Sequence, residues 1–258
     1  MQELVTTWPI ASPAMRVLVM LPTYNEIENI QDVLERARAA LPEADILVID
    51  DGSPDGTADL ADALGRTIGA ISVVRRHGEP GLGAAYRDGF RYGLDLGYDA
   101  VIEMDADLSH DPATIPALIA ALDAGADLAI GTRYMDGGAT PGWPWRRRVL
   151  SRAGGEYARR RLRLPSHDPT SGFRAFRSSL LRNCELDTVA AQGFAFQLEM
   201  LHRATRLGAR VVEVPIVFRD RTVGESKLSG AIAQEALRLV NALRRHPWQP
   251  ANRPLLGT

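Results

Sequence analysis

The 258-residue sequence contains one cysteine, one lysine and no long apolar run. Cys184 has no second cysteine to pair with, which excludes an internal disulfide and a zinc site built on several thiolates. A reducing compartment suits such a chain, and we expect the cytosol. The longest apolar runs, such as 17–21 and 117–122, fall far short of the roughly 20 residues that span a bilayer. Residues 1–14 lack the basic start and apolar stretch of a secretion signal, so we expect a loose N-terminal arm.

An excess of basic charge is also missing. The formal net charge of -2 excludes a globally basic nucleic-acid-binding protein, and we expect no nucleic acid among the partners. The average hides an Arg-rich segment at about 140–165, because residues 143–164 hold eight arginines against one acid, Glu156. We expect this segment to meet anions, and the alternative is a solvated basic helix that binds nothing. Of the 30 basic residues, 29 are arginine, and the exception is Lys227.

The remaining composition is typical of a globular protein, with 45% hydrophobic and 24% charged residues. Short runs rich in Val, Ile and Leu predict buried strands over 16–21, 45–49, 70–74, 100–104 and 127–131. Stretches of helix length separate them, and 26–41 repeats its apolar residues at helical spacing. This alternation predicts an α/β fold with a doubly wound parallel sheet. The second half is less regular, with a short run at 171–176, a helix near 196–207, a strand over 210–218 and a last helix over 228–245.

The length leaves little room for two full domains. We therefore expect a single domain over 15–245 and an irregular tail over 246–258. In doubly wound sheets, ligands bind at the carboxyl ends of the strands. The loops that follow the predicted strands are polar or rich in glycine, which places the candidate site at 22–26, 50–57, 81–85, 105–107 and 132–134.

Asp105 and Asp107 directly follow the fourth predicted strand. Two carboxylates at this edge repel each other unless water or a cation lies between them. A hard divalent ion with oxygen ligands suits them, and such an ion commonly shares the diphosphate of a nucleotide. Because Asp-x-Asp is a weak pattern by itself, a solvated loop is the alternative.

Asp50 and Asp51 follow the second predicted strand, where a carboxylate can accept hydrogen bonds from a base or a ribose. Capping of the next helix explains Asp55 and Thr57 better than a ligand does. Capping does not explain Asp50 and Asp51 together, so this pair is a candidate for nucleotide binding.

Two further loops carry weaker signals. The glycine-rich segment 81–85 lacks the third small residue of the dinucleotide fingerprint and follows the third strand, so we expect no nicotinamide cofactor. A phosphate-binding helix start and a plain tight turn are equally open for it. Arg133, at the end of the fifth strand, is either a phosphate clamp or the ion-pair partner of the two aspartates of the fourth loop, and the clamp is favoured.

Several segments together resemble a known family. Residues 21–26 (Leu-Pro-Thr-Tyr-Asn-Glu), 48–57 and 104–110 resemble inverting glycosyltransferases of the nucleotide-diphospho-sugar (GT-A) fold. The segments 142–147, 151–152, 171–174, 193–194 and 224–228 are similar to dolichyl-phosphate (polyprenyl-phosphate) mannose synthases. The resemblance runs from about residue 16 to 230 and implies a GT-A domain with a doubly wound, mostly parallel sheet and flanking helices. It is closest to a compact form without membrane helices, which reaches lipid by surface contact or through a membrane-anchored partner protein.

The resemblance also implies residue roles. The donor GDP-mannose would be held by Pro22, Tyr24, Glu26, Asp50, Asp105, Arg221 and Lys227, the last two at its diphosphate. Asp107 would be the principal ligand of a divalent cation, Mg²⁺ or Mn²⁺, with Asp105 beside it; Ser109 stands where some relatives have glutamine. The acceptor phosphate would meet Arg133, Arg147 and Ser151. The catalytic group would then comprise Asp107, Arg133, Arg147 and Lys227.

The implied reaction transfers mannose to a polyprenyl (dolichyl-type) monophosphate with inversion. A phosphate monoester with a second pKa of about 6 is mostly dianionic at neutral pH, so no general base is required. The protein must instead offset the charge of the acceptor and of the departing GDP. Trp143 and Trp145 suit an interfacial depth, so we expect peripheral association with the cytoplasmic membrane face.

Three alternatives stand beside this interpretation. The nearest is the same reaction with UDP-glucose as donor. A sugar-phosphate nucleotidyltransferase would need a glycine-rich loop after the first strand, which 22–25 does not provide. A non-catalytic nucleotide-sugar-binding subunit predicts a degraded metal site, which the intact pair Asp105 and Asp107 opposes.

Overall fold

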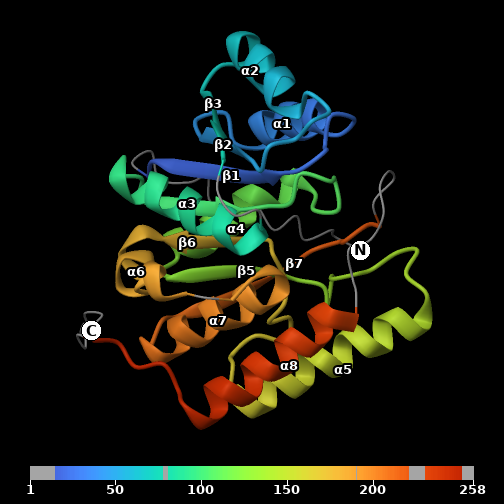
Figure 1. The fold of residues 1–258 in the computed structure, drawn as a ribbon, viewed down its shortest axis with the longest axis vertical. Helices are drawn as coiled ribbons and strands as arrows, with labels where there is room; N and C mark the ends of the chain where they lie inside the picture. The colour runs from blue at the N-terminus through green and yellow to red at the C-terminus, as the bar shows by residue number, and fades with distance from the viewer. Residues whose placement is uncertain (1–14, 78–80, 190, 221–229, 252–258) are drawn as a thin grey trace, which may run out of the picture.

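The computed structural model describes residues 15–77, 81–189, 191–220 and 230–251. Its strands form one sheet of order β3-β2-β1-β4-β6-β5-β7 (Figure 1). The strands are β1 (Val17–Thr23), β2 (Asp45–Asp50), β3 (Ile71–Arg75), β4 (Ala100–Glu103), β5 (Leu128–Thr132), β6 (Arg174–Arg177) and β7 (Val211–Pro215). The strands predicted in the first half are confirmed, with ends that differ by one or two residues.

The direction of β6 differs from the parallel sheet that the alternation predicts. β1 runs parallel to β2 and β4, β2 parallel to β3, and β5 parallel to β7. β6 runs antiparallel to both β4 and β5, which therefore point the same way. The chain leaves β5 at the carboxyl edge of the sheet and returns to the same edge after helix α5 (Trp145–Leu162). β6 therefore starts at this edge and runs in the direction opposite to β4 and β5. The sheet is mostly parallel, as the family resemblance implies.

The two faces of the sheet carry separate hydrophobic cores. Along β1, Leu18 and Met20 face the core formed with α3 (Leu82–Asp95), α6 (Ser178–Asn183) and α7 (Gly193–Arg206). Val19 and Leu21 face the core formed with α1 (Ile30–Ala40), α2 (Thr57–Ile68) and α4 (Ile115–Asp123). Because successive strand residues point to opposite faces, burial on both faces explains the nearly continuous apolar runs of the sequence.

The helix predicted over 26–41 begins later than expected, at Ile30. Asn25 has a left-handed φ of 60°, and the N–H of Glu26 donates to the hydroxyl of Thr57 at 3.0 Å. The backbone at 25–26 is therefore committed to a turn, and the periodic residue Ile27 precedes the helix. The predicted helix near 196–207 is α7, which begins earlier, at Gly193, and the predicted strand 210–218 is shorter, as β7.

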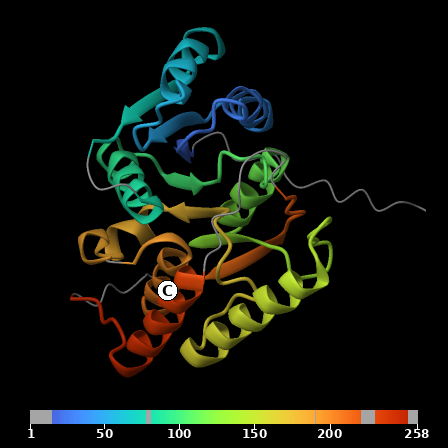
Figure 2. The same ribbon diagram turned by 45° about the vertical axis from the view of Figure 1, so that its right-hand side comes forward.

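The helix pair α5 and α8 (Gly230–Arg245) lies away from α1 and α2 (Figures 1 and 2). α8 packs against both α5 and α7. The Arg-rich segment of the sequence is thus largely α5, with its first turns near the end of the β5 loop and its last turn against α8. Among the described residues, no helix is long and apolar enough to cross a membrane.

Candidate active site

The polar loops meet at one edge of the sheet, as the topology rule predicts. β1, β2, β4 and β5 point the same way, so the residues after each of them lie at the carboxyl edge. β6 starts at this edge, which brings the segment 171–173 alongside. Donor, metal and acceptor candidates from distant parts of the sequence therefore share one side of the molecule.

Asp105 and Asp107 occupy the loop after β4. Asp107 is buried, and its Oδ1 accepts the N–H of Ser109 at 2.9 Å across Leu108, which has a left-handed φ of 61°. The side chain of Asp105 is 30% exposed, and its Oδ1 lies 3.3 Å from the hydroxyl of Tyr86 on α3. Ser109 is buried, and its Oγ has no hydrogen-bond partner among the described residues. The loop gathers oxygen atoms from two carboxylates and one hydroxyl.

His110 supports this loop from within. It is buried, and its Nδ1 accepts the N–H of Asp105 at 3.2 Å, so the imidazole proton sits on the other nitrogen. Its ring stacks on Phe173 at 5.0 Å and contacts the edge of Phe218 at 5.2 Å. Burial lowers the pKa of His110 despite the nearby aspartates. These contacts fit a structural role.

A buried pair of titratable side chains lies beneath the acidic loop, and the sequence did not predict it. Glu103 at the end of β4 and Arg174 at the start of β6 are fully buried, with Oε1 and Nε 3.8 Å apart. Burial raises the pKa of Glu103 to about 8, opposed by the Arg174 charge. Burial also lowers the pKa of Arg174 to about 10. The guanidinium donates to the carbonyls of Pro169, Ser171 and Gln197 at 2.7–2.9 Å, which fixes the segment before β6.

Asp50 is 1% exposed and organises the loop after β2. Its carboxylate accepts hydrogen bonds from the hydroxyl of Thr23, from the N–H groups of Gly52 and Ser53, and from the hydroxyl of Ser53. Gly52 has a left-handed φ of 76°, which glycine adopts without strain, in the turn whose two N–H groups donate to the carboxylate. The donor-binding role of Asp50 stays a prediction.

Asp51 joins the loop after β2 to the segment between β3 and α3. It forms an ion pair with Arg76 and accepts the N–H of Gly81 at 2.8 Å. Asp55, one position before the N-cap residue Gly56, accepts both the N–H and the hydroxyl of Thr57, at 2.9 and 2.6 Å, at the start of α2. Asp55 thus satisfies one free N–H of the helix start, as expected, whereas Thr57 is the first helical residue and does not cap the helix. Gly83 is needed for packing, because an added Cβ would lie 2.6 Å from the carbonyl oxygen of Ala191.

The residues expected to contact the nucleoside lie near the end of β1 and in the turn after it. Pro22 is half-buried within β1, and Tyr24 is 46% exposed. Glu26 accepts a hydrogen bond from the amide of Asn29 at 2.8 Å. These residues lie beside the Asp50 loop, since β1 pairs with β2 up to Thr23 and Asp50. Their contact with a donor stays a prediction.

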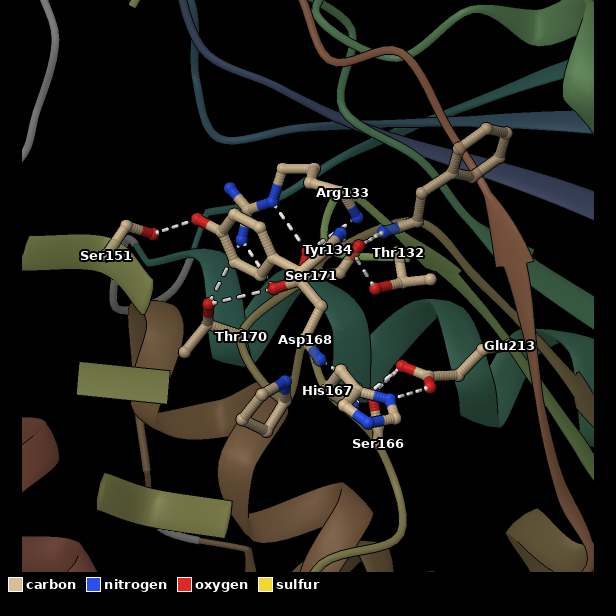
Figure 3. A network of polar contacts seen from close by, with 12 residues as sticks. Thr132, Arg133, Tyr134, Ser151, Ser166, His167, Asp168, Thr170, Ser171 and Glu213 are labelled. Carbon is tan, nitrogen blue, oxygen red and sulfur yellow. Dashed lines mark hydrogen bonds and ion pairs between the residues drawn. The ribbon is translucent and has the colours of Figure 1, made fainter. Parts of the chain in front are cut away.

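Arg133 forms a buried ion pair, but with a residue that the sequence analysis did not name. Its Nε and Nη2 donate to the two carboxylate oxygens of Asp168 at 2.6 Å each, and its backbone N–H donates to the same carboxylate at 3.0 Å (Figure 3). Burial alone lowers the pKa of Arg133, and the Asp168 charge outweighs it and raises this pKa. The predicted alternative, an ion pair with Asp105 and Asp107, is replaced by this pair. The clamp role stays a prediction.

The loop that carries Asp168 is itself held by β7. Glu213 accepts the hydroxyl of Ser166 and the N–H of His167 at 2.8 Å each, and its other oxygen lies 2.7 Å from the imidazole of His167 (Figure 3). Ser166 Oγ in turn accepts the N–H of Asp168 at 3.0 Å. A series of hydrogen bonds thus connects the edge strand β7, through the loop with Asp168, to the guanidinium of Arg133. No sequence pattern marks this loop.

The expected acceptor residues lie on and before the first turns of α5. Arg147 donates to Asp220 at 2.6 Å and stacks over the ring of Trp143 at 3.9 Å. The hydroxyls of Ser151 and Tyr134 are hydrogen-bonded at 2.6 Å (Figure 3). The structure brings Arg133, Arg147 and Ser151 into one neighbourhood, because Arg133 also lies over the ring of Trp143 at 5.5 Å.

The interfacial role expected for Trp143 is wrong. Trp143 is 5% exposed and packs edge-on against Phe218 at 5.6 Å, because the segment after β7 covers it. Trp145, Val149 and Leu150 are exposed instead, at 65%, 58% and 74%. The apolar surface of α5 therefore differs from the one predicted. Arg221 and Lys227 lie outside the described residues.

Comparisons with known proteins agree with this architecture. Residues 18–184 match the profile of Glycosyl transferase family 2. The chain belongs to this family. The family member is 48% identical over 226 residues to polyprenol monophosphomannose synthase of Mycolicibacterium smegmatis, covering 87% of this chain and 85% of that protein. It is 49% identical over 230 residues to undecaprenyl-phosphate mannosyltransferase of Micrococcus luteus, covering 89% and 93%.

Solved structures support the fold of this glycosyltransferase. Glucosyl-3-phosphoglycerate synthase from Mycobacterium tuberculosis, solved with Mn²⁺, uridine diphosphate and glucosyl-3-phosphoglycerate, superposes with a TM-score of 0.69 at 22% identity. The match covers 90% of this chain and 80% of that one. The expected GT-A fold is thereby confirmed.

Proposed function

We propose that this glycosyltransferase moves mannose from GDP-mannose to a polyprenyl monophosphate, with inversion, and yields polyprenyl-phosphate mannose. The observation that carries the proposal is the position of a cationic helix start beside the acidic pair of buried Asp107 and partly exposed Asp105. Trp143 contacts Phe218, Phe218 contacts His110, and His110 binds the backbone of Asp105. The near-50% identity to two enzymes named for mannose and polyprenyl phosphate supports the sugar and the acceptor.

The donor side rests on the loops after β1, β2 and β4. We assign Pro22, Tyr24, Glu26, Asp50 and Asp105 to the nucleoside, with Arg221 and Lys227 at the diphosphate. The ordered Asp50 loop provides a preformed wall, since its carboxylate already accepts four hydrogen bonds from within the protein. A preformed wall lowers the entropic cost of binding the nucleotide.

A divalent cation, Mg²⁺ or Mn²⁺, fits the acidic loop. The donor set is oxygen only, which suits hard cations, and the buried Ser109 Oγ without a partner among the described residues adds a hydroxyl. Asp107 and Asp105 would hold the ion, with water and the diphosphate completing its coordination shell. Bound there, the ion would offset the charge that develops on the departing GDP.

The acceptor side has unused hydrogen-bond donors. The indole N–H of Trp143 and the Nε of Arg147 are buried and have no partner among the described residues. An indole nitrogen only donates, and a buried donor without a partner costs about 1–3 kcal/mol. A phosphate oxygen would accept from such groups, with Arg133 and Ser151 nearby. The dianionic acceptor attacks without a general base, and the arginines offset its charge.

We further propose that the protein works at the cytoplasmic face of the membrane as a peripheral protein. The exposed apolar side chains of Trp145, Val149 and Leu150 lie on a helix rich in arginine. Anionic headgroups attract each nearby cation by about 1 kcal/mol, and apolar side chains add insertion energy. A membrane-anchored partner protein is a second route to the lipid acceptor.

One reaction separates the proposal from its alternatives. The protein is incubated with Mg²⁺ or Mn²⁺, a short polyprenyl phosphate and either GDP-mannose or UDP-glucose, and the lipid product is measured by mass spectrometry. We expect a hexose adduct with GDP-mannose, β-linked by NMR. An adduct only with UDP-glucose would favour the glucosyltransferase, and nucleotide binding without product would favour the non-catalytic subunit.

A further inference from the structure

A second cationic site lies at the far end of the helix pair. The ends of α5, α7 and α8 line a half-open cavity of about 360 Å³. Its walls include Arg161 and Arg163 from the end of α5, Arg206 from α7 and Arg244 from α8. Small-molecule sites in proteins commonly have volumes from about 300 Å³ upward. The cavity is therefore large enough for a phosphate group with a small organic substituent.

His202 on α7 also lines this cavity, and nothing in the described protein uses its ring nitrogens. The residue is 4% exposed, and neither Nδ1 nor Nε2 has a hydrogen-bond partner in the described part of the chain. Buried polar side chains are nearly always paired, because each one left without a partner costs about 1–3 kcal/mol. A ligand oxygen would accept the one ring N–H of the neutral imidazole and would so remove part of this cost.

The arginines of the cavity are also not neutralised. Across the described ranges, none of Arg161, Arg163, Arg206 and Arg244 forms an ion pair. Helix dipoles explain part of their placement, since cations favour helix C-termini. Three helix ends contribute about half a negative charge each, against four guanidinium charges, which leaves an excess of about 2.5 positive charges. Dipoles also do not explain the buried, unpartnered His202.

We propose that this cavity binds a phosphate-bearing anion, either a free phosphorylated compound or the headgroup of an anionic lipid. Guanidinium groups suit phosphate because they offer paired N–H donors, and a neutral imidazole adds one N–H. Arg161 is 14 positions after Arg147 on α5, which separates them by roughly 21 Å along the helix. The anion site is thus separate from the site of sugar transfer and does not depend on that proposal.

Histidine ring signals in ¹H–¹⁵N NMR spectra of the full chain test the proposal, with His202 assigned by loss of its signal in His202→Gln. Inorganic diphosphate is titrated first. We expect a saturable shift of the His202 signal, at least tenfold weaker affinity in Arg206→Gln/Arg244→Gln, and unchanged affinity in Arg66→Gln. Arg66 is an exposed arginine of α2, at the opposite end of the molecule (Figure 1). Arg161→Gln/Arg163→Gln, on α5, is a second variant that tests the same cavity from another helix.

A second titration separates the two sources of phosphate. Phosphatidylcholine bicelles are compared with and without phosphatidic acid. A His202 shift with diphosphate in solution supports a free phosphorylated ligand, and a shift only with phosphatidic acid supports a lipid headgroup. A His202 signal that responds to neither probe overturns the proposal, as does an equal response in both double variants and wild type.

Discussion

Arg133 and Asp168 are 35 residues apart in sequence and form a bidentate ion pair, with two N–O distances of 2.6 Å. Asp168 is fully buried and Arg133 nearly so. The pair fixes the loop after β5 to the loop before β6, and so fixes one wall of the proposed acceptor site. A buried charge that loses its partner is strongly destabilising.

Asp168→Ala should lower the free energy of unfolding by about 3–5 kcal/mol, because it leaves Arg133 charged, buried and unpaired. For a chain of this size, we expect a fall in Tm of roughly 10 °C. Asp136→Ala is the matched control, since Asp136 is exposed and lies in the same loop region as Arg133. Thermal unfolding followed by circular dichroism measures both; equal Tm values for the two variants would contradict the role of the pair.

Asp107→Ala should abolish turnover at every concentration of Mg²⁺ or Mn²⁺, because it removes the proposed main anchor of the ion. Ser109→Ala should reduce turnover less and raise the metal concentration that gives half-maximal rate. Asp123→Ala, on the exposed face of α4, is the control for loss of one carboxylate. Near-normal turnover of Asp107→Ala in the presence of a chelator would remove the metal from the mechanism.

Arg147→Gln should raise the KM for a short, soluble polyprenyl phosphate about tenfold, equivalent to about 1.4 kcal/mol, with little change in the KM for the donor. The reason is the loss of a charge-assisted contact to the acceptor phosphate. Arg182→Gln, at an exposed position of α6, removes the same charge elsewhere. A change confined to the KM for the donor would contradict the role of Arg147 at the acceptor phosphate.

Leu150→Ser should weaken binding to anionic vesicles, because Leu150 is the most exposed large apolar side chain of α5. Binding should also fall at high salt, which screens the arginines. Leu96→Ser changes an exposed leucine at the end of α3 and should bind like wild type. Sedimentation with vesicles measures this binding. Equal binding to neutral and anionic vesicles, or an equal loss of binding in both variants, would argue against a membrane-binding surface on α5.

His202 predicts a pH dependence of stability. Burial, aided by the charges of Arg206 and Arg203, lowers the pKa of His202 from 6.5 to about 4. Between pH 4 and pH 6.5 the unfolded chain binds a proton at His202 and the folded chain does not. The contribution of neutral His202 to the free energy of unfolding is therefore complete above pH 6.5 and is lost as pH falls toward 4. The loss is on the order of 3 kcal/mol. The free energy of unfolding, measured with denaturant from pH 7 to 4, should fall less steeply for His202→Gln than for wild type. His246→Gln, at an exposed position, should follow wild type.

Much of the fold could be predicted from sequence because buried strands and amphipathic helices leave periodic patterns. The rule that ligands bind at carboxyl ends then located the loops with Asp50, Asp105 and Arg133. Asp168 and Glu213 could not be found in this way, since their partners are distant and loops carry no period. Trp143 was misjudged for a related reason: its neighbour Phe218 lies 75 positions later, and only the folded chain brings them together.

The antiparallel strand β6 has a consequence for how the protein is made. β4 and β5 do not pair with each other, because β6 lies between them. During translation, β1 to β4 can pair as soon as they emerge, while β5 has no neighbour until Arg174–Arg177 has followed it out of the ribosome. Through that interval the nascent chain exposes one edge of β4 and an unpaired apolar strand, both of which attract other chains. We therefore expect ribosome-bound intermediates that end between β5 and β6 to favour aggregation or chaperone binding.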